Sequence, residues 1–512
     1  MTLKSIDARL LAGFGRIVEG LCDPARRNRV ALLAAFAYAA IWTLYATVAK
    51  SSQGINADFG DMVVWARNLA WGYPKHPPLA GWILAGWFAV FPTADWAYCL
   101  LAGLNLGIGL YFSFLLAGLW LEGEKRAVAP FLLALIPFYN FIGLKWDQNS
   151  ILIPLWALTT WAFVQSFERR HVGYAALAGA AAAAAMLTKY WSAFLVLSLV
   201  IAALCDRRRG SYFRSAAPWV TVLVGAVLIA PHVVWLFRED FPPLRWVATQ
   251  RTSASPLDWL RSLSEYSFGT MGYCAVAVLT CLLLVRSPPA AWRDVLFPRD
   301  AARRMALLIF WLPMLLPIVA AAATRTNLLS LWNTESLTLL PVVLLSSPLI
   351  TVTRTAAARI AGAAIVVSVA ALIASPIVAA TKFKAGVEND ASYVSAAVVA
   401  IDRAWQTATD RPLEILAGPF GLASSIAFTL KDRPSTFTNF SLFFSPWVDE
   451  QALMRKGLAV ICPSRDTACV QNMDALAKKR PEARRVELEL TPKWLGFAGT
   501  PDRFVIAIMP PR

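Results

Sequence analysis

Residues 305–324 read MALLIFWLPMLLPIVAAAAT, an uncharged run bounded by Arg303 and Arg304 on one side and by Arg325 on the other. A helix needs about 20 apolar residues to cross the ~30 Å hydrocarbon core of a bilayer. The run has that length and lies between basic residues, as membrane spans often do. It therefore predicts a transmembrane helix.

The composition of the whole chain agrees with this prediction. Of 512 residues, 58% are hydrophobic and only 16% are charged, and the mean hydropathy is +0.54, far above that of a soluble domain. The net charge of +16 comes from Lys and Arg in short clusters between apolar runs. We interpret these clusters as topology signals, so the chain is expected to contact the lipid bilayer and no nucleic acid.

Eleven stretches, uncharged apart from one glutamate in the tenth, approach the length of a span, and they predict a polytopic α-helical membrane protein. The segment before them, residues 1–29, is expected to be cytoplasmic, and charges such as Asp7 and Arg9 interrupt any cleavable signal there. The tenth stretch contains Glu335, and only Lys189 separates the fifth from the sixth. The stretches are residues 30–49, 96–121, 127–144, 148–167, 172–188, 190–205, 215–237, 266–285, 305–324, 331–353 and 360–381.

The distribution of basic residues sets the predicted sidedness. Residues 77–94 are also uncharged, but Pro77, Pro78 and Pro92 lie near the ends of the stretch, and Trp82, Trp87 and Phe88 suit a membrane interface. If this stretch does not span, one face holds about twice as many Lys and Arg as the other, whereas counting it as a span nearly equalises the two faces. We therefore predict an interfacial or re-entrant helix here, within a first external loop of residues 50–95. The transmembrane domain then covers residues 30–381.

The tail, residues 382–512, changes character. It alternates helical patterns, such as residues 393–407, with short apolar strands, such as residues 458–462. This pattern predicts a small α/β domain on the external face, the periplasm of a bacterial inner membrane. Cys462 and Cys469 flank a short loop there, so a disulfide is expected.

The first external loop carries the densest set of reactive side chains. Asp58, Phe59 and Asp61 are followed by Trp65 and Arg67, and then by a turn with the sequence WGYPKHPPL at residues 71–79. That turn brings Tyr73, Lys75 and His76 close to the membrane surface. Acids, aromatic rings and cations thus lie together on one predicted face.

This loop resembles the first loop of the family 39 glycosyltransferases, relatives of the protein O-mannosyltransferases and the lipid A aminoarabinose transferases within the C-type superfamily. In that family an acidic pair opens the loop, a Trp and an Arg follow, and a His-Pro-Pro-Leu turn comes after a Gly-Tyr. Aligning Trp65 and Arg67 places Asp58 at the first acidic position and Phe59 at the second, where Glu is usual. Either Asp58 suffices alone, or Asp61, one helical turn away, supplies the second carboxylate.

Further motifs extend the resemblance to roughly residues 30–350. Lys145-Trp146-Asp147 is similar to a second external acid of the family, and Thr188-Lys189-Tyr190 is similar to its Ser/Thr-Lys-Tyr element. The segment Pro231–Trp235 resembles a Pro and a Trp at the end of the seventh span, although Leu236 stands where Asn is usual. The resemblance implies the C-type architecture and a sugar donor linked to a polyprenyl phosphate.

Such a reaction has a good leaving group, so it needs chiefly a base and cations. Asp58 suits the base for an acceptor hydroxyl, with Asp147 as helper or sugar-positioning group and Asp61 as a second candidate. Trp65, Arg67, Tyr73, Trp332 and Glu335 are candidate acceptor or carrier contacts. The candidate ligands of the donor phosphate are Lys75, His76, Lys145, Lys189, Arg245 and Arg251.

Several alternatives stay open at this level. Asp58 and Asp61 could simply favour a helix N-terminus, Asp147 could pair with Lys145, Lys189 could snorkel, and His232 reads best as a packed residue at a helix end. The three histidines are too scattered for a zinc site, and nothing indicates a cofactor or a divalent metal. A secondary transporter or a flippase of envelope precursors is the competing functional class. The acceptor could be lipid A or another glycolipid, a polysaccharide or a protein hydroxyl.

Overall fold

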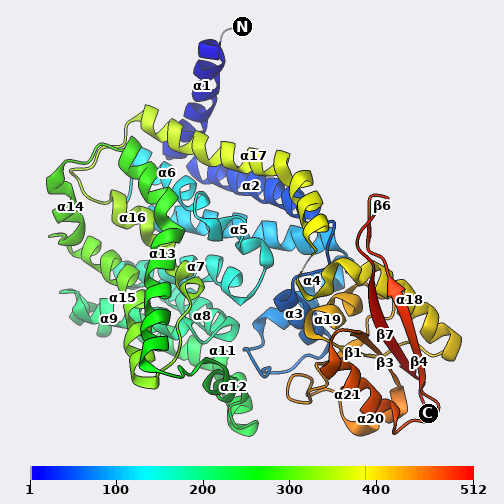
Figure 1. Ribbon diagram of the computed structural model, residues 1–512. Helices are drawn as coiled ribbons and strands as arrows, with labels where there is room; N and C mark the ends of the chain where they lie inside the picture. The colour runs from blue at the N-terminus through cyan, green and yellow to red at the C-terminus, as the bar shows by residue number, and fades with distance from the viewer. Residues whose placement is uncertain (1–2, 387) are drawn as a thin grey trace. The chain divides into compact units, whose positions relative to one another are not determined.

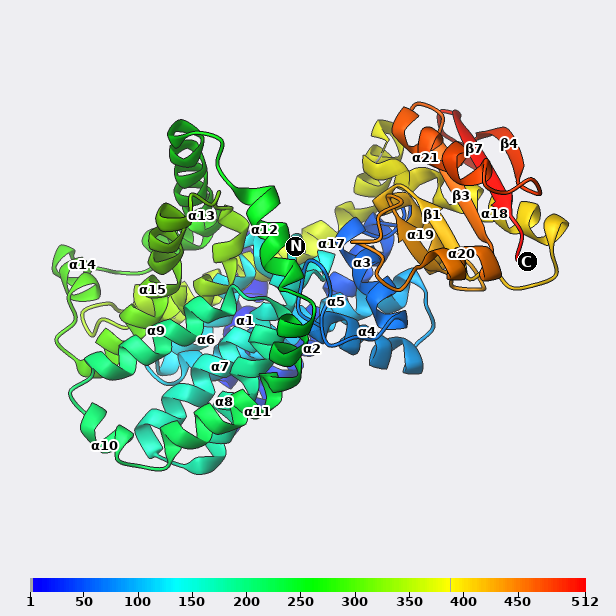
Figure 2. The same cartoon turned by 90° about the horizontal axis from the view of Figure 1, so that it is seen from below.

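The computed structural model describes residues 3–386 and 388–512, and the chain forms two compact units (Figures 1 and 2). The first unit comprises Met1–Thr43, Trp71–Leu79 and Leu100–Leu372. The second unit comprises Leu44–Ala70, Ala80–Cys99 and Ile373–Arg512. The first external loop is therefore divided, because its Trp71–Leu79 turn packs with one unit and its preceding helix with the other.

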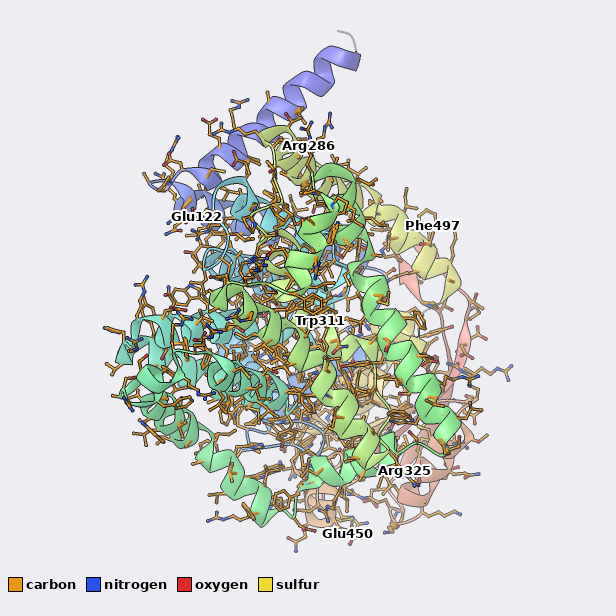
Figure 3. All side chains as sticks on the ribbon, turned by 90° about the vertical axis from the view of Figure 1, so that its left-hand side faces the viewer. Glu122, Arg286, Trp311, Arg325, Glu450 and Phe497 are labelled. Carbon is orange, nitrogen blue, oxygen red and sulfur yellow. A yellow bond between two sulfur atoms is a disulfide. The ribbon has the colours of Figure 1, made fainter. Side chains whose placement is uncertain are left out.

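Seven helices among the described residues are long and apolar enough to cross a membrane. Many of their large apolar side chains are exposed, for example Phe268 and Val319, as expected for surfaces that lipid covers. Arg286 after α13 and Arg325 after α15 lie toward opposite ends of this unit, with Trp311 between them (Figure 3). These helices are α2 (Arg27–Ala49), α5 (Asp95–Ala117), α7 (Gln148–Arg169), α11 (Ala217–Arg238), α13 (Pro256–Leu284), α15 (Ala301–Thr324) and α17 (Arg354–Ala385). The prediction of a polytopic helical membrane protein is confirmed.

The predicted span 127–144 is bent. Helix α6 (Gly123–Ala134) is followed by two 3₁₀ turns, η1 (Pro137–Tyr139) and η2 (Gly143–Lys145), at an angle of 81°. Ile136 precedes a proline and is extended, a backbone state that ends a helix. Counting this pair as one span gives eight.

The prediction of one continuous helix over residues 331–353 is wrong. This stretch forms a 3₁₀ helix, η3 (Ser330–Leu339), and a short helix, α16 (Leu340–Leu345). The polar side chains of η3 bond neighbouring segments: Asn333 Nδ2 donates to Thr270 Oγ1 at 3.0 Å, and Thr338 Oγ1 lies 2.8 Å from the Tyr139 hydroxyl. A proline at residue 348 disfavours helix at Ser347, which ends the run.

The remaining helices of the first part of the chain are short or terminal. Helix α4 (Leu79–Val90) has 12 residues, about 18 Å at 1.5 Å per residue, so it is too short to cross ~30 Å of hydrocarbon. That length agrees with the prediction that residues 77–94 do not span. The others are α1 (Leu3–Cys22), α3 (Ala57–Arg67), α8 (Val172–Thr188), α9 (Ser192–Cys205), α10 (Arg209–Phe213), α12 (Pro242–Arg251) and α14 (Pro289–Leu296).

The C-terminal part folds as the predicted α/β domain, around a five-stranded sheet of order β2-β1-β3-β7-β4. The strands β1, β2 and β3 are parallel, and β7 runs antiparallel to β3 and β4. The strands are β1 (Ile415–Gly418), β2 (Ser435–Thr438), β3 (Leu458–Pro463), β4 (Arg484–Leu490) and β7 (Asp502–Met509), with a separate ribbon of β5 (Lys493–Trp494) and β6 (Phe497–Ala498). The helical segments are η4 (Glu388–Tyr393), α18 (Val394–Ala408), α19 (Phe420–Thr429), α20 (Glu450–Lys456) and α21 (Thr467–Ala477).

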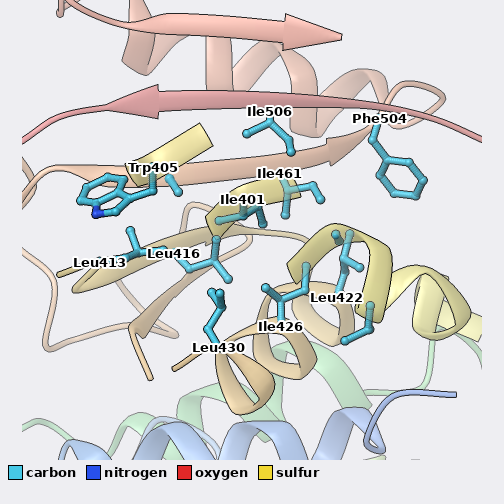
Figure 4. Close-up of a cluster of buried hydrophobic side chains, with 14 of the residues drawn as sticks. Ile401, Trp405, Leu413, Leu416, Leu422, Ile426, Leu430, Ile461, Phe504 and Ile506 are labelled. Atoms are coloured by element: carbon cyan, nitrogen blue, oxygen red, sulfur yellow. The ribbon is translucent and has the colours of Figure 1, made fainter. Parts of the chain in front are cut away.

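Apolar side chains cover both faces of this sheet. On one face Ile401, Trp405 and Ile426 from α18 and α19 pack against strand residues such as Leu416 and Phe504 (Figure 4). On the other face α20 and α21 cover a second cluster. Cys462 and Cys469 form the disulfide that the sequence predicts, joining the end of β3 to α21.

Candidate active site

The turn at residues 71–79 is fixed to the end of α11. His232 Nδ1 lies 2.5 Å from the Trp71 carbonyl oxygen, and the Tyr190 hydroxyl lies 2.9 Å from His232 Nε2. Because a carbonyl can only accept, Nδ1 carries the proton, and the Tyr190 hydroxyl donates to Nε2 of the neutral ring. A Cβ on Gly72 would lie 2.3 Å from the Trp235 ring, so only glycine fits there. His232 thus positions the turn from a buried helix end.

Asp147 is held rigidly at the start of α7. Its carboxylate accepts from the Ser150 backbone N–H at 2.9 Å and from the Ser150 hydroxyl at 3.0 Å, the contacts of an N-cap. The side chain is 4% exposed, and Trp146 before it adopts a left-handed conformation (φ 45°). The other carboxylate oxygen, Oδ2, accepts a long hydrogen bond of 3.4 Å from Asn149 Nδ2. Asp147 is therefore a buried and preorganised acid.

Lys189 lies between α8 and α9, and its side chain reaches the start of α7, close to Asp147. Its ammonium group donates to Asn149 Oδ1 and lies 5.1 Å from the centroid of the Trp332 ring, within the range of a cation–π contact. The Trp191 and Trp332 rings pack with centroids 5.0 Å apart. Lys189 is thus oriented by one amide and two indoles.

Glu335 is the most buried acid of this region. It is 0% exposed, and its Oε2 lies 3.5 Å from Thr334 Oγ1. Among the described residues its other oxygen, Oε1, has no hydrogen-bond partner. A buried polar atom in this state is unusual, so a ligand is a natural partner for it.

Lys75 and His76 come from the Trp71–Leu79 turn. Burial, together with the positive charges of Lys189 and Lys75, lowers the pKa of His76 to about 3. The imidazole is therefore neutral near neutral pH, so it can donate or accept one hydrogen bond but adds no charge. Lys75 and Lys189 supply the positive field.

This pKa predicts a specific sensitivity to acid. Between about pH 8 and about pH 5 the unfolded chain gains a proton on His76 near an ordinary pKa of about 6.5, whereas the folded chain does not, so stability falls as the pH falls. His76→Asn should lose part of this dependence. Thermal unfolding in detergent at both pH values measures it. His171→Asn serves as the control, because His171 is an exposed residue at the start of α8, and equal pH dependence in all three proteins would contradict the prediction.

In the second unit, Asp58 lies exposed in the first turn of α3, whose N-cap is Asn56. Phe59 beside it points into an aromatic cluster: it is 0% exposed, stacks on Tyr98 at 3.9 Å between centroids and meets Phe88 and Phe428 edge-on. The residue that replaces the usual Glu is therefore part of the core. Asp61 is half-buried one turn further along α3.

Restoring the family residue by Phe59→Glu is expected to destabilise the protein. The carboxylate would replace a ring packed among Tyr98, Phe88 and Phe428, and burying a carboxylate among aromatic rings costs several kcal/mol. Phe59→Leu keeps the site apolar and should cost about 1–2 kcal/mol. Thermal unfolding of the two purified variants compares them, and a Phe59→Glu protein as stable as the parent would refute the assignment of Phe59 to the core.

Arg67 joins α3 to the C-terminal domain within the second unit. Arg67 donates to the carbonyl oxygens of Pro434 at 2.8 Å and Ala427 at 3.3 Å, and Trp65 is buried. Burial and the nearby charge of Arg433 lower the pKa of Arg67 to about 10. Arg67 also lines a cavity of about 530 Å³ with α4 and the domain edge, where Trp447 contributes an indole.

The remaining candidate residues of the predicted site lie in exposed positions, outside the described side chains or in the core. Lys145 is exposed, Arg245 forms an exposed ion pair with Asp240 at 2.9 Å, and the side chain of Arg251 lies outside the described part of the chain. Tyr73 is buried in its turn. Within the described ranges no group of three or more His, Cys, Asp or Glu side chains could hold a metal ion.

The spanning helices, the cationic turn beside a buried acid and the C-terminal α/β domain together define a known membrane-enzyme fold. The crystal structure of ArnT from Cupriavidus metallidurans bound to undecaprenyl phosphate is similar over 93% of this chain and 97% of that one, with a TM-score of 0.61 and 15% identity. At that identity the likeness concerns the fold alone. The chain has the fold of the C-type glycosyltransferases.

The sequence comparisons agree with this class. Residues 75–235 match the family described as dolichyl-phosphate-mannose-protein mannosyltransferase. The lipopolysaccharide core galacturonosyltransferase RgtB of Rhizobium johnstonii is 25% identical over 325 residues, which are 61% of this chain and 63% of RgtB. The chain thus matches a little under two thirds of the length of this curated relative. The resemblance to the family 39 glycosyltransferases is confirmed.

Proposed function

We propose that this chain is a membrane glycosyltransferase that moves a hexose- or pentose-type sugar from a polyprenyl-phosphate donor to an acceptor of the bacterial envelope. The observation that carries the proposal is Lys189, held by Asn149 and two indoles beside a buried Asp147. A fixed cation in a membrane protein suits the phosphate of a lipid-linked sugar. The undecaprenyl phosphate bound to ArnT supports the same class of carrier.

The donor phosphate needs charge stabilisation more than protonation. As the bond between the anomeric carbon and the phosphate oxygen breaks, negative charge grows on the phosphate, and preorganised cations lower that barrier. Lys189 and Lys75 take this role, with neutral His76 as a hydrogen-bonding neighbour. The secondary candidates for the phosphate are Lys145, Arg245 and Arg251. Lys145 and Arg245 lie in exposed positions, where water screens their charge. Asp147 and Glu335 are suited to hydroxyl groups of the sugar.

Asp58 is the proposed base. A carboxylate that accepts the proton of the attacking hydroxyl contributes typically about 10²–10⁴-fold to the rate. Asp58 is exposed, so an acceptor hydroxyl can reach its carboxylate. Asp58 is not among the buried residues of α3. Asp61 is the candidate for a second carboxylate, since Phe59 is part of the core.

The acceptor is proposed to be an envelope glycolipid rather than a polysaccharide or a protein hydroxyl. The name of RgtB refers to the lipopolysaccharide core, which supports a lipid-linked acceptor. The cavity beside Arg67 and Trp447 offers a cation and an indole face, and such groups suit an anionic sugar. We place the reaction and the C-terminal domain on the periplasmic face of the inner membrane, from the distribution of basic residues.

Binding of undecaprenyl phosphate tests the carrier directly. The purified full chain in nanodiscs should bind this lipid, and Lys189→Met should bind it at least about tenfold more weakly, as expected for loss of a charge-assisted hydrogen bond. Lys479→Met, an exposed lysine of the C-terminal domain, is the matched control. Equal binding by all three proteins would contradict the proposed phosphate site.

A further inference from the structure

A two-stranded ribbon projects from the C-terminal domain (Figure 1). Its strands β5 and β6 pair through Lys493 with Ala498 and Trp494 with Phe497. Leu495 and Gly496 form the tip, both with positive φ (48° and 86°), the backbone of a tight two-residue hairpin turn. The ribbon is separate from the five-stranded sheet.

The base of this ribbon is fixed to the ends of two spanning helices, all within the second unit. Trp494 Nε1 donates to Ser51 Oγ at 3.0 Å, two residues after the end of α2 at Ala49. The Trp494 ring also packs on Phe383, with 5.9 Å between centroids, in the last turn of α17. Since α2 and α17 are candidate spans, the ribbon begins beside the ends of two helices that are expected to reach the membrane interface.

The tip has the composition of a membrane-contacting element. Leu495 is 77% exposed and Phe497 is 67% exposed, although nothing in a domain with its own core requires large apolar groups there. Exposed lysines surround the base: Lys493 on β5 and Lys382 and Lys384 at the end of α17. Aromatic residues and lysines are enriched at membrane interfaces, where the rings meet the acyl boundary and the ammonium groups meet lipid phosphates.

We propose that the β5–β6 hairpin is a membrane anchor of the C-terminal domain, with Leu495 and Phe497 inserted at the headgroup–acyl boundary of the adjacent leaflet and the three lysines on phospholipid phosphates. The hairpin lies beside the ends of α2 and α17, where both candidate spans are expected to reach the membrane interface. We therefore infer that its exposed tip contacts lipid. The anchor holds the domain at the membrane surface, independently of which sugar the enzyme transfers.

Photo-crosslinking in native membranes tests this inference. A benzophenone amino acid replaces Leu495 or Phe497 in the full chain, and intact-mass measurement after irradiation detects phospholipid adducts. Val486 on β4 is the matched control, because it is an apolar and exposed residue of the same domain on the main sheet. We expect several-fold more lipid adduct from residues 495 and 497 than from residue 486.

Two results would overturn the inference. One is equal lipid labelling at residues 486, 495 and 497, and the other is crosslinking of the tip to a protein in place of lipid. Each variant is first checked for membrane insertion and for the Cys462–Cys469 disulfide. A second variant, Leu495→Ser combined with Phe497→Ser, keeps Trp494 and its contacts, and it should expose the ribbon to protease in liposomes. Unchanged protease resistance would also count against the anchor.

Discussion

Replacing Lys189 by methionine is expected to reduce sugar transfer by about 100-fold or more, because removal of one preorganised charge-stabilising donor typically costs about 10²–10³ in rate. The loss should appear in both donor affinity and turnover, since the proposed role of the ammonium group is to contact phosphate before and during bond cleavage. Lys189→Arg keeps the charge but not the geometry set by Asn149 and Trp332, so partial activity is expected. Complementation of a deletion strain, read as the amount of modified glycolipid, measures both variants.

The transfer measurement on Lys189→Met can be interpreted only if the variant is folded. Because Lys189 bonds Asn149, thermal unfolding of Lys189→Met must first show that the helical unit persists. If the variant folds and still transfers sugar at the parental rate, Lys189 is a snorkelling residue and the phosphate site lies elsewhere.

Replacing Asp58 by asparagine is expected to reduce turnover by about 10²–10⁴-fold, the usual contribution of a general base. Binding of undecaprenyl phosphate should be unchanged, because the proposed base acts on the acceptor and not on the carrier. The exposed position of Asp58 and the cap by Asn56 mean that the near-isosteric change leaves α3 packed. Asp402→Asn on α18, where the half-buried Asp402 accepts a hydrogen bond from Gln406 of the same helix, is the control and should retain full activity.

Asp61→Asn distinguishes the two interpretations of the departure at Phe59. A loss as large as that of Asp58→Asn would assign a second catalytic carboxylate to Asp61, whereas a small loss would leave Asp58 to act alone. Full activity of Asp58→Asn would remove the base from the proposal, and it would favour the transporter class.

The positions of the long spans could be predicted because lipid imposes one strong requirement, an apolar run of fixed length. The predicted count of eleven is not confirmed: seven described helices, or eight with the bent pair, have that length, and the apolar helices Val172–Thr188 and Ser192–Cys205 are shorter. The exceptions have local causes. Proline 137 forces Ile136 out of helix, and the polar side chains around Asn333 find partners on α13 instead of continuing a helix. The short strand β2 and the ribbon β5–β6 escaped prediction because two to four residues carry too little periodicity.

The site could be predicted in part. Asp147 and Lys189 are distant in sequence, and the predicted sidedness together with the family resemblance placed them on one face, whereas His232 was predicted to be a packed residue at a helix end. The structure joins them through contacts that no spacing encodes, namely Lys189 with Asn149 and His232 with the Trp71 carbonyl. Asn149 and Trp191 were missed, since an amide and an indole beside a lysine have no signature of their own.

Mass spectrometry of the envelope glycolipids tests the proposed sugar transfer to a glycolipid acceptor. Deleting the gene should remove one sugar-sized increment from a single glycolipid class. The intact gene should restore that increment, and the Asp58→Asn and Lys189→Met genes should not. An unchanged glycolipid profile in the deletion strain, or full restoration by Asp58→Asn, would contradict the account.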